Sequence, residues 1–294
     1  MKNSRQRFIF EDLNVRGELV SLDSSWESVL SRRVYPSKIQ KLLGELTAAA
    51  ALLSATIKLD GSLAIQFNGK TELQLLLAEV RDSKTFRSTA KWSKKFESMF
   101  NTKNALANGH LAVTITPRKT KQPYQGLVEI NGDSIQLALE GYMEQSEQLT
   151  TRIWLTSNER KATGMLLQKL PENQSAGDKE DWIRATTLAS TITEDELLEL
   201  SFESILRRLF HEETIRVFNA ESLDFKCTCS DERTIRMLSA LGKDEISDIL
   251  AKQKKISVTC EFCGMNYSYS KHGIERAIGL NTAKNAGTNN RTVN

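Results

Sequence analysis

Two short stretches, Cys227-Thr228-Cys229 and Cys260-Glu261-Phe262-Cys263-Gly264, hold all four cysteines of this 294-residue chain. Thirty residues separate the two pairs. Zinc takes four thiolates at about 2.3 Å in a tetrahedron, and two close pairs that a fold brings together meet this geometry. We therefore predict a zinc site inside a small module over residues 227–294. The predicted ligands are Cys227, Cys229, Cys260 and Cys263.

The residues around the second cysteine pair indicate a β-hairpin. Ile256 and Val258 favour a strand that leads into the pair. Gly264 can adopt the positive φ of a tight metal-binding turn. Tyr267 and Tyr269 favour a second strand that leads out. The hairpin would thus present two of the four sulfurs.

The residues between the two pairs indicate two short helices. The run Ser230-Asp231-Glu232 is typical of a helix start and Leu241-Gly242 of a helix stop. Ile246, Ile249 and Leu250 mark the second helix. The part of this module from 227 to about 280, near 54 residues, has a marginal core by itself. Bound zinc could contribute about 10–16 kcal/mol to its folding.

Other uses of the cysteines fit the pattern less well. Ordinary buried cysteines would not gather as two close pairs in one segment. His211 and His272 could replace a sulfur ligand, but four cysteines leave no vacancy. A thioredoxin-like Cys260-x-x-Cys263 motif should open a helix, not a hairpin arm. The spacing alone allows either a permanent structural site or a redox switch.

Residues 1–172 predict an α+β domain, because strands and helices mix without a βαβ rhythm. Two strands over residues 8–22 break at Asn14, with a bulge at Gly17. A core helix follows Ser37, and Ser134 caps another after an Asn131-Gly132 turn. Further strands are expected at 63–67, 73–80, 111–115, 127–130 and 151–155, and a short helix at 166–170.

Residues 173–226 predict an acidic helical linker, with 12 acidic and six basic side chains. A polar loop at 172–178 marks its start, and Thr193 with Glu196 forms a capping box for a helix over 194–210. That helix is either a plain core helix, which its pattern alone favours, or a detachable cover over an apolar surface. Its apolar face consists of Leu198, Phe202, Ile205, Leu206 and Leu209.

Composition limits the class of protein. With 39% apolar and 26% charged residues, the chain should be globular. Its longest uncharged apolar stretch, Leu46–Ile57, is shorter than the roughly 20 residues that span a bilayer. Because no apolar segment follows Met1–Arg5, we expect no secretory signal and a cytoplasmic location. The polar tail over 281–294 should be disordered.

Several stretches resemble the family of redox-regulated 33-kDa heat-shock chaperones. The cysteine segments carry the most specific resemblance, with the Glu-Phe spacer between Cys260 and Cys263. The other matches lie in the linker and the first domain. The resembling stretches are Phe225–Arg233, Val258–Gly264, His211–Phe218, Gly164–Gln168, Leu43–Leu46 and residues 141–149.

The resemblance implies an ATP-independent holdase of the bacterial cytoplasm, not an enzyme. Residues 1–172 would bind clients, 173–226 would be a metastable linker and 227–294 the redox switch. The reduced protein would bind one zinc ion and be inactive. Oxidation would release zinc and form the disulfides Cys227–Cys229 and Cys260–Cys263. The switch and linker would then unfold, and the protein would dimerise, bind unfolding clients and hand them to ATP-dependent foldase chaperones.

Two other classes of protein compete with this interpretation. A zinc-ribbon nucleic-acid binder is suggested by Lys252, Lys254 and Lys255, but the adjoining linker carries a net charge of −6. A thiol oxidoreductase would use Cys260 and Cys263, which requires a reactive thiolate instead of a closed four-sulfur site. We therefore expect neither a nucleic-acid nor a membrane partner.

Overall fold

The computed structural model describes residues 3–56, 60–98, 105–120, 122–130, 134–171, 178–253, 255–270 and 273–274. The chain divides into two compact units, Met1–Lys226 and Cys227–Asn294. The first contains mainly antiparallel sheets and helices that follow no βαβ order, which confirms the α+β class.

The first sheet of unit 1, sheet A, joins strands from both ends of the unit. Its order is β10-β1-β2-β9-β8, and β11 also pairs with β1. All of these pairings are antiparallel. The strands are β1 (Ser4–Phe10), β2 (Val15–Leu22), β8 (Thr151–Ser157), β9 (Ala162–Lys169), β10 (Ile215–Val217) and β11 (Glu221–Ser222).

The second sheet, sheet B, has the order β12-β5-β4-β3-β6-β7. Its strands pair antiparallel except for β12, which runs parallel to β5. In β3, Leu63, Ile65 and Phe67 alternate with partly exposed residues and are fully buried. The strands are β3 (Gly61–Asn68), β4 (Leu73–Arg81), β5 (Thr85–Trp92), β6 (His110–Pro117), β7 (Tyr124–Glu129) and β12 (Asp224–Phe225).

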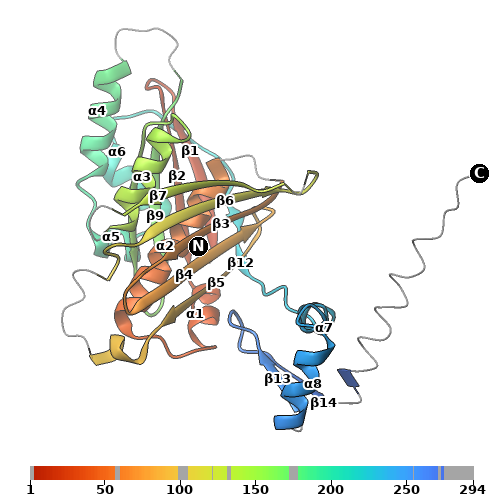
Figure 1. Ribbon diagram of the computed structural model, residues 1–294. Helices are drawn as coiled ribbons and strands as arrows, with labels where there is room; N and C mark the ends of the chain where they lie inside the picture. Colours follow the sequence, from red (N-terminus) through yellow and green to blue (C-terminus); the bar gives the residue numbers. More distant parts are fainter. Residues whose placement is uncertain are drawn as a thin grey trace, which may run out of the picture. The chain divides into compact units, whose positions relative to one another are not determined.

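Helix α2 (Ser37–Thr56) contacts strands of both sheets and forms the centre of the core (Figure 1). Its stretch Ala48–Ala51 is fully buried. These small side chains let the backbones of two sheets approach one helix. The remaining helices of the core are α1 (Ser24–Leu30), the 3₁₀ helix η1 (Lys94–Ser98) and α3 (Ile135–Gln145).

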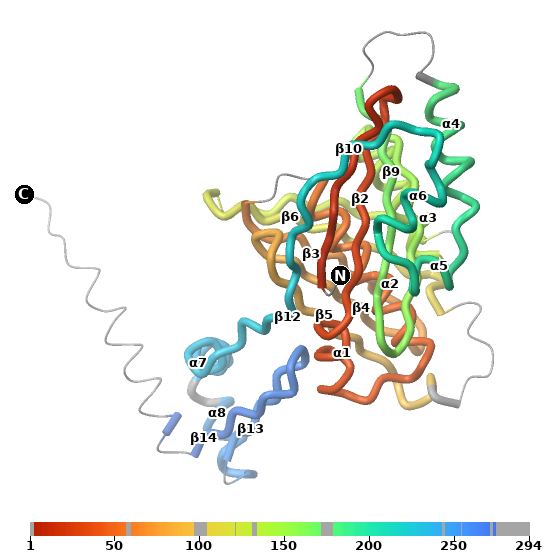
Figure 2. The backbone as a smooth tube through the Cα atoms, turned by 180° about the vertical axis from the view of Figure 1, so that it is seen from behind, coloured from red at the N-terminus to blue at the C-terminus, as the bar shows by residue number. Residues whose placement is uncertain are grey.

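Three helices from residues 173–226 cover the face of sheet A that is turned away from α2. They are α4 (Asp178–Ala189), α5 (Glu194–Glu199) and α6 (Phe202–Phe210), and we call them the linker helices. Their apolar side chains form one buried cluster with Phe8 and Phe10 of β1. Phe10 meets Phe210 edge to face, with ring centroids 4.9 Å apart. After α6 the chain returns along β1 as β10 (Figure 2).

Unit 2 contains two helices and a hairpin. They are α7 (Asp231–Ser239), α8 (Lys243–Lys252), β13 (Lys255–Thr259) and β14 (Asn266–Ser270). The Ser230 side chain accepts from Arg233 N and caps α7, as its sequence predicts. Gly242, with φ of 91°, separates the two helices. The predicted hairpin and both predicted helices are confirmed.

The predicted helix at 166–170 is wrong, because these residues belong mostly to strand β9. Leu166 packs in the cluster around α2, whereas Met165 and Leu167 pack under the linker helices. Because β9 is buried on both faces, its run Met165–Leu167 is continuously apolar and shows no period of two.

The predicted helix over 194–210 is also wrong as a single helix. Leu200 is extended, with ψ of 152°, and the Ser201 side chain starts α6 by accepting from Ser204 N. The capping box of Thr193 and Glu196 is confirmed at the start of α5.

Gly17 does not form a bulge, because β1 and β2 stay in register across it. A Cβ atom there would lie 2.0 Å from the Phe8 ring, so the glycine makes room for this ring. The helix capped by Ser134 and the core helix after Ser37 are confirmed. The Asn131-Gly132 turn, the loop at 172–177, the tail over 281–294, Lys254 and His272 lie outside the described residues.

Candidate metal centre

The four cysteine sulfurs of unit 2 form one group, which we call the sulfur cluster. The Sγ atoms of Cys227, Cys229, Cys260 and Cys263 all lie within 4.8 Å of one another. The Sγ–Sγ distances are 3.7 Å for Cys227–Cys260 and 3.3 Å for Cys229–Cys263. Four thiolates around zinc lie about 3.8 Å apart, as bonds near 2.3 Å require. The cluster therefore has the size of a metal site.

Local backbone structure positions each pair. The second pair lies in the turn between β13 and β14, where Gly264 N donates to Cys260 O at 2.8 Å. Cys260 N donates to Met265 O at 2.9 Å, and Gly264 has the positive φ of 69° expected for this turn. The first pair precedes α7, and the Arg233 side chain donates to Thr228 O at 2.8 Å.

Two tyrosines of β14 join the hairpin to the first pair. The Tyr267 hydroxyl donates to Cys229 Sγ at 3.2 Å. The Tyr269 hydroxyl donates to Asp231 Oδ1 at 2.9 Å, at the first residue of α7. From the sequence, we predicted both tyrosines only as residues of a strand. Their spacing of two residues, which places both rings on one face of a strand, could have indicated a common role.

The surroundings give the thiols different pKa values. Burial raises the pKa of Cys227 and, together with hydrogen bonds among the sulfurs, raises that of Cys263 to about 12. Burial also opposes ionisation of Cys229, but hydrogen bonds from Tyr267 and the other sulfurs outweigh it and lower the pKa to about 7. Without a cation, the four sulfurs would therefore not all be thiolates near neutral pH. A bound metal ion would supply the missing positive charge.

The donor set suits zinc, because soft thiolate ligands in a tetrahedron favour it. In the described part of the chain, these four cysteines are the one group of His, Cys, Asp or Glu that could hold a metal ion. His211 is exposed at the end of α6 in unit 1. The structure thus brings together four residues that can hold a metal ion, and zinc remains our prediction.

The predicted apolar face of the linker lies mostly against sheet A. Phe202, Ile205, Leu206 and Leu209 are buried, but Leu198 is only half-buried. The break at Leu200–Ser201 shifts the helical period, so that Leu197 replaces Leu198 at the buried face. Leu197 and Phe210, which are 5% and 2% exposed, also belong to the buried face, although we did not predict them from the sequence. The second helix cap at Ser201 could have signalled the break.

Polar contacts fix the linker helices at their edges. Lys41 of α2 pairs with Glu194 of α5, with Nζ and Oε2 2.8 Å apart. Lys161 Nζ donates to Leu198 O at 2.7 Å. Arg184 of α4 pairs with Glu213 beyond α6 at 2.6 Å. The helices are thus attached by an apolar face and by polar contacts, of which the exposed Lys41–Glu194 pair contributes little by itself.

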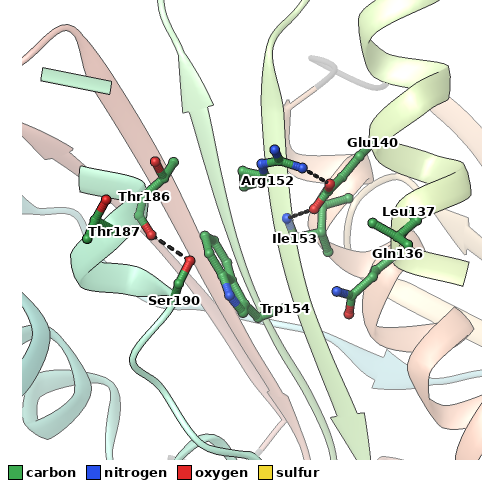
Figure 3. Close-up of a pocket in the computed structure, with 9 residues that line it drawn as sticks. All are labelled: Gln136, Leu137, Glu140, Arg152, Ile153, Trp154, Thr186, Thr187 and Ser190. Carbon is green, nitrogen blue, oxygen red and sulfur yellow. Dashed lines mark hydrogen bonds and ion pairs between the residues drawn. The ribbon is translucent and has the colours of Figure 1, made fainter. Parts of the chain in front are cut away.

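A cavity of about 440 Å³ lies where α4 meets β8 and α3 (Figure 3). Trp154 forms part of its wall, and Glu140 accepts from Arg152 Nη1 at 2.5 Å and from Ile153 N at 2.8 Å. Both carboxylate oxygens of Glu140 are thereby occupied. No pattern in the sequence predicted this cavity. Among the described residues, no helix is long and apolar enough to cross a membrane.

Comparisons with known proteins give a consistent result. The family model described as Hsp33 protein matches residues 3–270. The 33 kDa chaperonin of Methylobacillus flagellatus is 42% identical over 271 residues, which cover 92% of each chain. The 33 kDa chaperonin of Hahella chejuensis is 43% identical over 273 residues, 92% of this chain and 95% of the relative.

A crystal structure shows the same fold. It is the 33 kDa chaperonin, a heat shock protein 33 homologue, of Thermotoga maritima, which matches with a TM-score of 0.81. The match covers 96% of this chain and 99% of that one, at 20% sequence identity. From the family model and the two close relatives, we conclude that the chain belongs to the Hsp33 protein family.

Proposed function

We propose that this protein is a redox-regulated, ATP-independent holdase chaperone that is inactive while reduced and zinc-bound. Its relatives are named chaperonins, which supports the binding of unfolded client proteins. The observation that carries the proposal is the sulfur cluster. An oxidant that converts the four thiolates into two disulfides would remove all the ligands of one metal ion.

Unit 2 is a fitting target for such a switch, because its own core is small. The buried apolar side chains of its described part are Leu238, Ile246, Ile256, Tyr269 and Ile274. A structural zinc ion can supply more folding free energy than a core of this size. Loss of the metal should therefore unfold unit 2.

Oxidation would close two disulfides, Cys227–Cys229 and Cys260–Cys263. In each, two thiolates give up two electrons to an oxidant such as peroxide or hypochlorite, and zinc leaves as Zn²⁺. The Cys260–Cys263 disulfide should form first, because a two-residue spacer closes with less strain than a one-residue spacer. The Cys227–Cys229 disulfide should wait for unfolding and form faster with heat.

The linker helices would respond next. They contain 12, six and nine residues, and isolated helices of such length are marginal in water. Their stability depends on the apolar face of sheet A. Release of this metastable linker, residues 173–226, would expose the apolar surface on residues 1–172, which we propose binds clients.

The remaining parts of the proposal concern partners and location. The oxidised protein would form a homodimer and hand clients to ATP-dependent foldase chaperones in the cytoplasm. We propose no catalytic residues and no binding to nucleic acid or membranes. The net charge of −6 on the linker disfavours the zinc-ribbon alternative.

The decisive experiment measures bound zinc and client aggregation before and after oxidation. Reduced protein should carry one zinc ion and leave a heat-unfolded client to aggregate. Oxidised protein should lose the zinc and suppress aggregation, and reduction with added zinc should reverse both changes. Equal suppression by reduced, zinc-loaded protein would contradict the proposal. DNA or RNA binding that ignores oxidation would favour the zinc ribbon, and turnover of a disulfide substrate would favour the oxidoreductase.

A further inference from the structure

Strand β14 supports the hairpin and also supplies a side chain that contacts the sulfur cluster. Tyr267 pairs with Val258 and Tyr269 with Ile256 in the ladder of β13 and β14. This register fixes the backbone of both tyrosines. Tyr269 is buried in the small core of unit 2, whereas Tyr267 is half-buried and directs its hydroxyl to Cys229.

Tyr267 connects the two cysteine pairs. The hairpin that carries Tyr267 also presents Cys260 and Cys263 in its turn. Cys229 comes from the other pair, more than 30 positions earlier, and its Sγ lies 3.2 Å from the Tyr267 hydroxyl oxygen. One hydroxyl thus ties the first pair to the strand that supports the second.

A hydrogen bond to a sulfur ligand has two chemical effects. It fixes the side-chain rotamer of the cysteine, so that the sulfur lone pairs stay directed at the metal. It also withdraws electron density from the sulfur, which makes the sulfur a poorer nucleophile towards an oxidant. Partners of this kind around metal ligands typically change metal affinity about 10–100-fold.

We propose that Tyr267 is a positioning residue that sets how firmly the reduced cluster retains zinc and how readily Cys229 is oxidised. This inference rests on the proposed redox function. With hydrogen peroxide, the Cys229 thiolate attacks an oxygen atom, forms a sulfenic acid and releases hydroxide. The Cys227 thiolate then attacks the Cys229 sulfur, forms the disulfide and displaces a second hydroxide. In folded unit 2 the Tyr267 hydrogen bond slows the first attack, and the second attack follows once the unit opens.

The test compares Tyr267→Phe with Tyr269→Phe, because both variants remove one hydroxyl from the same strand. Zinc affinity is measured by competition with a chelator, and oxidation of each cysteine by alkylation and mass spectrometry. Tyr267→Phe should weaken zinc binding about 10-fold. It should also raise the oxidation rate of Cys229 relative to that of Cys263. Tyr269→Phe should leave this ratio unchanged, because its hydroxyl contacts Asp231 and not a sulfur.

A cobalt-loaded form separates positioning from mere structural support. Loss of the hydrogen bond should shift the sulfur-to-cobalt charge-transfer band to lower energy in Tyr267→Phe but not in Tyr269→Phe. In zinc-loaded wild type, the Tyr267 hydroxyl proton should exchange slowly with water, which tests the contact even if a variant fails to fold. Rapid exchange would overturn the inference.

Two further results would overturn it. One is a Tyr267→Phe protein with the zinc affinity, charge-transfer band and cysteine oxidation rates of wild type. The other is an equal loss of zinc affinity in both variants without a band shift. Both leave the proposed function intact as long as wild type releases zinc on oxidation. A wild-type protein that binds no zinc would instead reject the proposed function and this inference with it.

Discussion

The two compact units are stabilised by different means. Unit 1 packs two six-stranded sheets around α2, and its core contains large buried side chains such as Trp26, Phe67 and Tyr142. The described part of unit 2 has five buried apolar side chains beside the sulfur cluster. Oxidants do not react with most of an apolar core, but they react readily with thiolates. We therefore expect unit 1 to persist under oxidation and unit 2 to depend on its four sulfurs for folding.

The largest expected effect tests this difference directly. Removal of the metal from reduced protein by a strong chelator should unfold unit 2, because structural zinc can contribute about 10–16 kcal/mol. Residues 1–172 should keep their protection, since they contain no cysteine. Hydrogen exchange with mass spectrometry can follow both units in one sample. Retained protection across 231–270 would show that unit 2 folds on its apolar core alone.

The next prediction concerns the boundary between scaffold and linker. Ile205 is 1% exposed and packs against sheet A, so Ile205→Ala should destabilise the linker helices by about 2–5 kcal/mol. Hydrogen exchange across 202–210 should accelerate in the reduced protein. The exposed Arg207 on the same helix offers a matched control, and Arg207→Ala should change exchange little. Equal effects of the two variants would remove the distinction between buried and exposed faces of α6.

A smaller effect concerns pH and unit 1. Burial raises the pKa of Glu18 to about 7, despite the nearby charges of Arg5 and Arg7, while Glu221 adds to the rise. The protonated form is therefore favoured in the folded state. The contribution of protonated Glu18 to the stability of unit 1 is fully present below pH 4.5 and is lost as the pH rises through about 7.

This stabilisation amounts to about 3 kcal/mol, from the difference between the Glu18 pKa of 4.5 in the unfolded chain and about 7 in the folded protein. Glu18→Gln should remove it, so that denaturant midpoints of unit 1 depend less on pH between 5 and 8 than in wild type. Because Glu45 also has a pKa raised to about 7 by burial, Glu45→Gln provides a second, independent variant. Identical pH profiles for wild type and both variants would contradict this account.

The smallest effect concerns the last strands of unit 1. Glu221 of β11 accepts from the buried Arg5 side chain at 2.5 Å, and Arg5 also donates to Ser54 Oγ at 2.9 Å. Because Glu221 is largely exposed and Arg5 keeps Ser54, Glu221→Gln should cost only about 1 kcal/mol. Exchange at 221–225 should accelerate slightly. Glu212→Gln, which alters an exposed pair with Arg184, should have no measurable effect on stability. A larger loss of stability from Glu212→Gln than from Glu221→Gln would contradict this prediction.

The sequence predicted unit 2 better than unit 1, for a physical reason. The cysteine pairs, the Ser230 cap and Gly264 act over a few residues, so that their pattern indicates the hairpin, both helices and the sulfur cluster. The strand β9 was mistaken for a helix because both of its faces are buried. The break before Ser201 has a local signal in its helix cap, which the continuous apolar pattern on both sides obscured. The contact from Tyr267 to Cys229 depends on which surfaces meet in three dimensions, and no local pattern encodes it.

The strand order of unit 1 has a consequence for its synthesis on the ribosome. Strands β3 to β7 follow one another in sequence, so this part of sheet B can assemble once residue 129 has emerged. In sheet A, the free edge of β2 pairs only after β9 has been made, and the free edge of β1 pairs only after β10, residues 215–217, has been made. At about 5–20 residues per second, the nascent chain carries an open β1 edge for about 10–40 s. Until then, the newly made protein is itself a candidate client for chaperones.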